Sequence, residues 1–328
     1  MHKSHLMSRF KLGLAVMSVV FVMLNTLSCS DTRHAPLKLG TTVWVGYEPL
    51  YLGREKGFVD KKEIKLVELL SATQVMNAFR NKTIDIAALT MDEVLILAEE
   101  KFDLMVFLVL DASNGGDAVI ANNKYSHFAQ LKSKKIGYEN TAVGAYMLSR
   151  ALDKHNMKSG EVNLVSMNVN ETERALLNEH VDAVVTFEPA KSRLIEKGFK
   201  EVFSSREIPN EILDVLIIRK ELVDSEEDRL QRLVDGWFMT LNHFDRNKEA
   251  SLAFMNQRLK LSDKGIATAF DGIVFPGKSE NQNFFADDIN ESALSAIAVR
   301  ISEEMRVNNL LKESIERFAL YENKFVQN

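Results

Sequence analysis

WVGYEPLYLGREKGF, residues 44–58, is the stretch that decides the fold. It closes an apolar run that begins at Leu37, and we expect a strand over residues 37–45. Gly46 to Pro49 has the composition of a turn, and residues 50–56 predict a helix that Gly57 ends. A strand, a turn and a helix in this order are typical of an α/β protein.

The same alternation of strand and helix continues along the chain. Residues 64–69 and 84–89 predict strands, and each is followed by a predicted helix, at 73–81 and 92–99. In a second unit we expect strands at 135–138, 164–167 and 181–186 and helices at 143–155 and 171–179. This alternation predicts an α/β fold in which mostly parallel sheets are flanked by helices.

Two further apolar runs, 104–110 and 215–218, bracket the second unit. We interpret them as the places where the chain leaves a first lobe and returns to it. The first lobe is then residues 37–122 plus 213–328, and the second is residues 123–212. Two crossings of this kind are what a hinged, two-lobed binding protein requires. Most of the chain after the second crossing reads as helix, with amphipathic runs at 227–244, 248–256 and 289–304.

The two units end a strand in the same way. Thr90-Met91-Asp92 follows an apolar strand in the first unit, and Thr186-Phe187-Glu188 follows one in the second. Ligands of α/β sheets lie beyond the carboxyl ends of the strands. The two Thr-x-acid motifs therefore predict matching polar groups on either side of one crevice.

Composition and motifs exclude several classes of protein. The 328 residues are 46% hydrophobic and 27% charged, which is typical of a folded globular chain. A net charge of −5 without a basic stripe argues against nucleic-acid binding. The seven histidines form no metal-ligand pair, and there is no GxSxG, P-loop or GxGxxG motif. We therefore expect no catalytic residues, no metal and no cofactor.

Residues 1–28 have the pattern of a signal peptide. A basic start precedes the apolar run 12–24, which is too short for a membrane span of ~20 residues. Thr26-Leu27-Ser28-Cys29 then resembles a bacterial lipobox, although Thr26 stands where that motif usually has leucine. The resemblance implies an exported, extracytoplasmic protein attached to a membrane only through lipidated Cys29, with 29–36 as a tether. The alternative is cleavage by an ordinary signal peptidase.

The stretch 44–58 resembles the first strand, turn and helix of nitrate/sulfonate/taurine-type ABC-transporter substrate-binding proteins, which are related to the thiamine-precursor-binding family. Further matching motifs are Thr90–Glu93, Asp111–Asp117, Ile136–Glu139 with Gly144–Tyr146, and Val184–Pro189. The resemblance covers roughly residues 37–245 and implies a type II periplasmic binding protein, with a ligand cleft between two lobes. It does not specify the ligand, which varies within the group.

Carried over position by position, the resemblance also implies a ligand site. Its residues are Trp44, Tyr47, Glu48, Thr90, Met91, Asp92, Ser113, Asn114, Asp117, Asn140, Thr141, Ala142, Thr186 and Glu188. Some of them have an ordinary structural role as the alternative. Trp44 and Tyr47 could be core aromatic residues, Thr141 could cap a helix, and Glu188 could be a solvated loop acid.

Acidic residues dominate the predicted strand ends and the turns beside them. They are Glu48, Asp92, Glu93, Asp117, Glu139 and Glu188, and the matched motifs place no lysine or arginine there. A sulfonate or nitrate pocket prefers N–H groups, hydroxyls or arginine, whereas several carboxylates repel an anion. We therefore predict a zwitterionic or cationic ligand such as an aminosulfonate, an aminopyrimidine or an amine. The alternative is that some of these acids cap helices and face solvent.

The predicted function is that of a monomeric, extracytoplasmic solute-binding lipoprotein that delivers a small molecule to an ABC permease. One alternative is a sensory binding protein that docks on a membrane receptor and transports nothing. Another is a thiamine-precursor (aminopyrimidine) binder, and a third is an extracytoplasmic enzyme, which would turn its ligand over. Some relatives of this fold are enzymes of pyrimidine or menaquinone-precursor synthesis that work inside cells, and the signal peptide argues against that branch.

Overall fold

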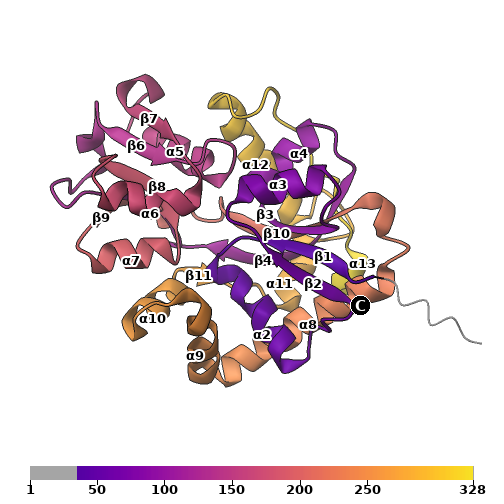
Figure 1. Cartoon of the computed structure of the whole chain (residues 1–328). Helices are drawn as coiled ribbons and strands as arrows, with labels where there is room; N and C mark the ends of the chain where they lie inside the picture. Colours follow the sequence, from indigo (N-terminus) through magenta and orange to yellow (C-terminus); the bar gives the residue numbers. More distant parts are fainter. Residues whose placement is uncertain (1–34, 328) are drawn as a thin grey trace, which may run out of the picture. The chain divides into compact units, whose positions relative to one another are not determined.

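Two β-sheets organise residues 35–327, the residues that the computed structural model describes. Figure 1 shows the strands β6 to β9 on the left, in magenta and rose, and the strands β1 to β4 with β10 on the right. Residues 36–327 belong to one compact unit. The predicted signal peptide, Cys29 and the tether up to residue 34 lie outside the described residues.

The first sheet has the strand order β11-β4-β10-β3-β1-β2. Its strands are β1 (Leu37–Thr41), β2 (Ile64–Glu68), β3 (Ile86–Thr90), β4 (Leu104–Ser113), β10 (Leu213–Arg219) and β11 (Ile273–Val274). The helices between them are α2 (Glu48–Lys56), α3 (Ala72–Arg80) and α4 (Met91–Glu99), and α2 is preceded by the 3-10 turn η1 (Val45–Tyr47). The predicted first strand is thus too long, because it ends at Thr41 and Trp44 already introduces the turn.

The second sheet has the order β7-β6-β8-β5-β9. Its strands are β5 (Asp117–Ala121), β6 (Lys135–Tyr138), β7 (Asn163–Ser166), β8 (Ala183–Phe187) and β9 (Lys200–Ser204). Its helices are α5 (Val143–Lys154), α6 (Val169–Leu177) and α7 (Ala190–Glu196). The remaining 3-10 turns are η2 (Phe128–Leu131), η3 (Ser159–Glu161), η4 (Ser205–Glu207) and η5 (Lys220–Leu222).

Both sheets are mixed, so the expectation of mostly parallel sheets is wrong. Parallel pairing is confined to β2–β1–β3 and to β7–β6–β8. In contrast, β10 runs antiparallel to β3 and β4, and β5 runs antiparallel to β8 and β9. The chain reaches β10 and β5 by crossing from the other sheet, so no crossover helix has to return it in the parallel sense.

The first crossing also lies earlier than predicted. We expected the chain to stay in the first lobe up to residue 122, but β5 pairs with β8 and β9 of the second sheet. The chain therefore leaves the first sheet between Ser113 and Asp117. It is back in the first sheet at Leu213, where β10 begins. The short strand β5 is buried along its whole length, so its pattern carries no local signal for its sheet.

The C-terminal third is mostly helical. Its elements are α8 (Glu227–Arg246), α9 (Lys248–Leu259), α10 (Asp263–Asp271), α11 (Lys278–Phe284), α12 (Ala293–Val307) and α13 (Lys324–Gln327). The buried residues of α8 include Leu230, Val234, Trp237 and Leu241, which recur every three or four residues along one face. Helix α8 packs against α2 and so fixes the helix that follows the first turn. Within residues 35–327, no helix combines the length and apolarity that a membrane span needs.

Candidate ligand-binding site

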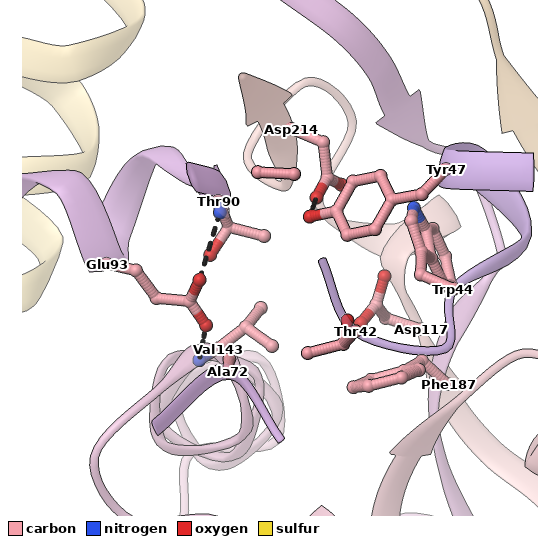
Figure 2. Close-up of a pocket in the computed structure, with 11 residues that line it drawn as sticks. Thr42, Trp44, Tyr47, Ala72, Thr90, Glu93, Asp117, Val143, Phe187 and Asp214 are labelled. Atoms are coloured by element: carbon pink, nitrogen blue, oxygen red, sulfur yellow. Dashed lines mark hydrogen bonds between the residues drawn. The ribbon is translucent and has the colours of Figure 1, made fainter. Parts of the chain in front are cut away.

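A small cavity lies where strand ends of the two sheets meet (Figure 2). The residues that line it are Thr42, Trp44, Tyr47, Ala72, Ala88, Thr90, Glu93, Asp117, Val143, Phe187 and Asp214. Its volume is about 20 Å³, which is room for a single water molecule. The lining comes from both sheets, since Phe187 ends β8 whereas Thr90 ends β3.

Strand register explains why acids gather here. Asp214 of β10 pairs with Thr90 of β3 on one side and with Asp111 of β4 on the other. Asp117, the first residue of β5, pairs with Phe187 at the end of β8. The parallel strands point their carboxyl ends toward the same place, as is usual for ligand sites of α/β sheets.

The first turn fits closely against β4. A Cβ atom at Gly46 would overlap the Asp111 carboxylate and the indole nitrogen of Trp44, so glycine permits their approach. The Trp44 Nε1–H donates to both Asp111 oxygens at 3.3 Å. The Trp44 ring meets the Phe187 ring edge-on, with centroids 5.5 Å apart. Trp44 thus packs a first-sheet turn against a second-sheet strand end.

Tyr47 contacts a second acid of the cavity, Asp214. Its hydroxyl donates a hydrogen bond to the Asp214 carboxylate, as Figure 2 shows. Burial, followed by the nearby Asp111, raises the pKa of Asp214 well above its usual value. Burial and the Asp214 carboxylate likewise raise the pKa of the Tyr47 phenol.

The other acids of this region also hold their protons unusually tightly. Burial raises the pKa of Asp111 to about 8, that of Asp117 to about 7 and that of Asp92 to about 6. Burial and the adjacent Asp92 raise the pKa of Glu93 well above its usual value. An incoming positive charge would favour the ionised form of each group.

Several buried oxygens have no hydrogen-bond partner among the described residues. They are Oδ2 of Asp117, Oγ1 of Thr90 and both carboxylate oxygens of Asp92. Leaving a buried polar atom unpaired costs about 1–3 kcal/mol. Within residues 35–327, no lysine or arginine lines the cavity. A ligand that donates hydrogen bonds and carries positive charge would satisfy the Asp117 and Thr90 oxygens, which belong to the cavity lining.

A buried cation, Lys191, lies outside the cavity lining and has its own partners. The Lys191 ammonium donates to the carbonyl oxygen of Gly115 at 2.5 Å and pairs with Glu201 at 3.0 Å. It also lies 3.8 Å from Glu188, whose carboxylate accepts bonds from Ser192 at 2.9 and 3.1 Å. Glu188 is therefore buried and faces α7, and burial raises its pKa.

The structure places four of the predicted site residues in the cavity wall: Trp44, Tyr47, Thr90 and Asp117. Asp92 is buried beside them, next to Glu93 in the first turn of α4. Ser113 lies behind Asp117, where its hydroxyl accepts the Asp117 N–H at 3.0 Å.

The other predicted residues lie outside the lining. Glu48 points away and pairs with Arg258 at 3.1 Å, although burial still raises the pKa of Glu48 to about 7. Met91 lies in the core, and the Thr186 hydroxyl bonds Thr172 at 3.1 Å. Ala142 precedes the first turn of α5. Asn114, Asn140 and Thr141 are exposed.

Seven residues that line the cavity are absent from the predicted ligand site, although Glu93 is among the acids expected at the strand ends. They are Thr42, Ala72, Ala88, Glu93, Val143, Phe187 and Asp214. Glu93 and Phe187 stand inside motifs that the sequence singles out, so motif position alone could have included them. Asp214 has only one signal, its place directly before an apolar strand. In the described part of the chain, no three His, Cys, Asp or Glu side chains are arranged to hold a metal ion.

Comparison with known structures defines the class of fold. The alkanesulfonate-binding protein SsuA from Xanthomonas axonopodis pv. citri, bound to MOPS, has a TM-score of 0.71 at 14% identity, over 85% of this chain and 95% of that one. A ligand-binding component of an ABC-type import system from Staphylococcus aureus has a TM-score of 0.69 at 14% identity, over 90% and 98%. The desulfurization enzyme DszB has a TM-score of 0.64 at 16% identity, over 90% and 98%. The chain thus has the fold of periplasmic binding proteins, which at least one enzyme shares.

Sequence comparison then gives the family. The chain belongs to the NMT1-like family, whose model matches residues 30–255. A protein of Brucella abortus (strain 2308), provisionally named as a binding protein, is 27% identical over 156 residues. That match covers 46% of this chain and 49% of the Brucella protein, so the chain spans about half the length of the curated relatives it matches.

Proposed function

We propose that this protein is the solute-binding component of an ABC importer and captures a small polar ligand with a positively charged group. The observation that carries the proposal is the cavity between the two sheets, lined by Glu93, Asp117 and Asp214. Trp44 and Phe187 add aromatic walls. Carboxylates beside aromatic faces suit an amine, an aminopyrimidine or an aminosulfonate that enters amine first.

Ligand capture requires the two sheets to separate. A cavity of about 20 Å³ holds about one water, so even a small amine cannot enter this conformation unaided. The chain crosses between the sheets twice, at residues 114–116 and again between β9 and β10. We propose these crossings as the hinge of a two-lobed binder, with residues 36–113 and 213–327 as the first lobe and 117–204 as the second. Closure on a ligand then sets the population that a permease recognises.

The proposed location is extracytoplasmic. It rests on the signal-peptide pattern of residues 1–28 and on Cys29 at the expected cleavage point. Lipidation of Cys29 would hold a monomer at the membrane surface while the binding unit stays in water. We infer the partnership with a permease from the fold and the family alone.

Two alternatives predict different behaviour. A sensory binding protein would bind the same ligand but would leave uptake of that ligand unchanged when it is deleted. An enzyme would return a changed ligand, which matters because the desulfurization enzyme DszB shares the fold. We favour a binding protein because SsuA and the Staphylococcus aureus component, which share the fold, are named as binding proteins. Among the described residues, the cavity lining also contains no histidine, lysine, serine or cysteine.

Thermal unfolding against a ligand panel tests the proposal. The panel contains polyamines, amino acids, aminopyrimidines and taurine, with nitrate and alkylsulfonates as anionic controls. A ligand at a hundred times its Kd should stabilise the protein by about 2.7 kcal/mol and raise the Tm by several degrees. The proposal expects the rise with amine-bearing compounds. A rise with simple oxyanions alone would refute a cationic ligand, and a chemically changed hit would favour the enzyme.

A further inference from the structure

Two glutamates reach across the cavity region to helices of the opposite lobe. Glu93 lies in the first turn of α4 in the first lobe, and its Oε1 accepts the N–H of Val143, the first residue of α5, at 3.1 Å. Glu139 follows β6 in the second lobe, and its Oε1 accepts the N–H of Thr73, in the first turn of α3, at 3.1 Å. The Thr73 hydroxyl donates to the same oxygen. The two contacts are reciprocal, because each lobe supplies one carboxyl group and one helix.

The donors in both contacts are helix N-terminal amides. The first four N–H groups of a helix have no partner within it, and the helix dipole favours negative charge there. Such ends bind phosphate, sulfate and carboxylate groups. Val143 begins a helix of 12 residues, and Thr73 is the second residue of a helix of 9. The protein's own carboxyl oxygens thus occupy the positions that an oxyanion would take.

Burial and hydrogen bonds to both carboxylate oxygens fix the position of the Glu93 side chain. Its side chain is buried, and its second oxygen accepts the Thr90 N–H at 3.0 Å, so each oxygen has one amide donor. Figure 2 shows the carboxyl group spanning the space between Thr90 and Val143. A Cβ atom at Gly144 would lie 2.8 Å from the Glu139 carbonyl oxygen, so glycine lets the Glu139 segment pack against the first turn of α5.

We propose that Glu93 and Glu139 act as internal ligands of α5 and α3, which hold the lobes together and exclude oxyanions from the site. The inference rests on the proposed function, because it takes the cavity as the ligand site. It deepens that function by naming the class of group that is rejected. Sulfonate, nitrate and carboxylate groups find the amides already occupied, so a ligand is selected by its cationic end.

Chemical rescue tests the proposal in the purified full-length protein. Glu93→Ala frees both amide donors, and formate, nitrate or methanesulfonate should then fill the space. We expect these ions to raise the Tm of Glu93→Ala by at least about 3 °C relative to chloride at equal ionic strength. The wild-type Tm should not respond. Small-angle scattering should show a larger radius of gyration for Glu93→Ala, which formate reduces.

Glu171→Ala is the matched control. Glu171 also accepts the N–H of its own helix cap, Asn168, at 3.0 Å, but this contact stays within one lobe. Its removal should leave the radius of gyration unchanged and create no response to formate. Glu139→Ala, at the other contact, should behave like Glu93→Ala and replaces it if that variant does not fold.

The proposal is overturned if oxyanions stabilise the wild type as much as the variants. It is also overturned if folded Glu93→Ala and Glu139→Ala neither expand nor respond to oxyanions. No amine enters these measurements, so they remain decisive even if the amine panel fails. Conversely, an amine hit with unresponsive variants would support the proposed function and reject the internal-ligand role.

Discussion

Asp117→Asn should weaken ligand binding while it stabilises the free protein. Asp117 lines the cavity at the start of β5, and its Oδ2 has no hydrogen-bond partner among residues 35–327. Asparagine preserves the shape of the side chain and removes its charge. Losing a charge-assisted bond to a ligand ammonium costs about 1.5–3 kcal/mol, which is roughly a 10- to 150-fold rise in Kd.

Whereas binding should weaken, the free energy of unfolding of the ligand-free protein should increase. Burial raises the pKa of Asp117 to about 7, well above the value of about 4 for an unfolded aspartate. The folded protein therefore keeps a proton that the unfolded chain has released, and its stability falls as pH rises from about 4 to 7. The fall attributable to this group is of the order of 4 kcal/mol and is complete above pH 7. Asparagine does not titrate, so the variant should lack this part of the fall.

Two measurements check the pair of effects. Calorimetric titration with the tightest amine of the panel, at pH 6, 7 and 8, should show affinity rising with pH in the wild type and changing less in Asp117→Asn. Urea unfolding at pH 5 and 8 should show that the free energy of unfolding of the variant, relative to that of the wild type, is larger at pH 8 than at pH 5. Asp271→Asn, an exposed substitution in α10, serves as control and should change neither. Unchanged affinity together with an unchanged pH profile would refute the acidic-pocket argument.

Three further predictions concern single residues. Trp44→Ala removes the indole that packs on Phe187, so the variant should stay folded by circular dichroism but bind the amine at least about 10-fold more weakly by calorimetry. Tyr47→Phe leaves the buried Asp214 without its phenolic donor, and urea unfolding should show a loss of about 1–3 kcal/mol. Cys29→Ser should move the protein from the membrane to the soluble fraction of cells, and continued sedimentation with membranes would reject lipidation.

The part of the site that sequence could predict is local. Trp44 and Tyr47 stand in a turn directly after a strand, and Thr90 ends one. In an α/β sheet, that position alone points a side chain toward the ligand edge. Asp117 reaches the same edge in another way. It begins β5, which runs antiparallel to β8, so the start of β5 lies beside the carboxyl end of β8.

The rest depends on contacts between distant parts of the chain. Asp214 enters the cavity because β10 pairs antiparallel with β3, a register that no local pattern encodes. Val143 lines the cavity, and its amide donates to Glu93, which lies 50 residues earlier. Glu48 is the opposite case. It stands in a motif expected to line the site, but its side chain lies outside the cavity and pairs with Arg258, 210 residues later. Spacing along the chain predicts which residues reach a strand end but not which partners they find there.

The positive charge that we propose for the ligand rests on these distant contacts rather than on the fold. The same architecture serves an alkanesulfonate-binding protein, so strand ends and helix N-termini alone permit an anion. Here Glu93 binds the α5 amide and Glu139 binds the α3 amide, and the unpaired carboxylate oxygen of the described cavity lining belongs to Asp117. These two amide donors are thus bonded to glutamates of the protein itself, whereas a carboxylate acceptor stays free for a ligand. A site whose remaining capacity is to accept hydrogen bonds selects a donor, and a cationic donor relieves the repulsion among its carboxylates as well.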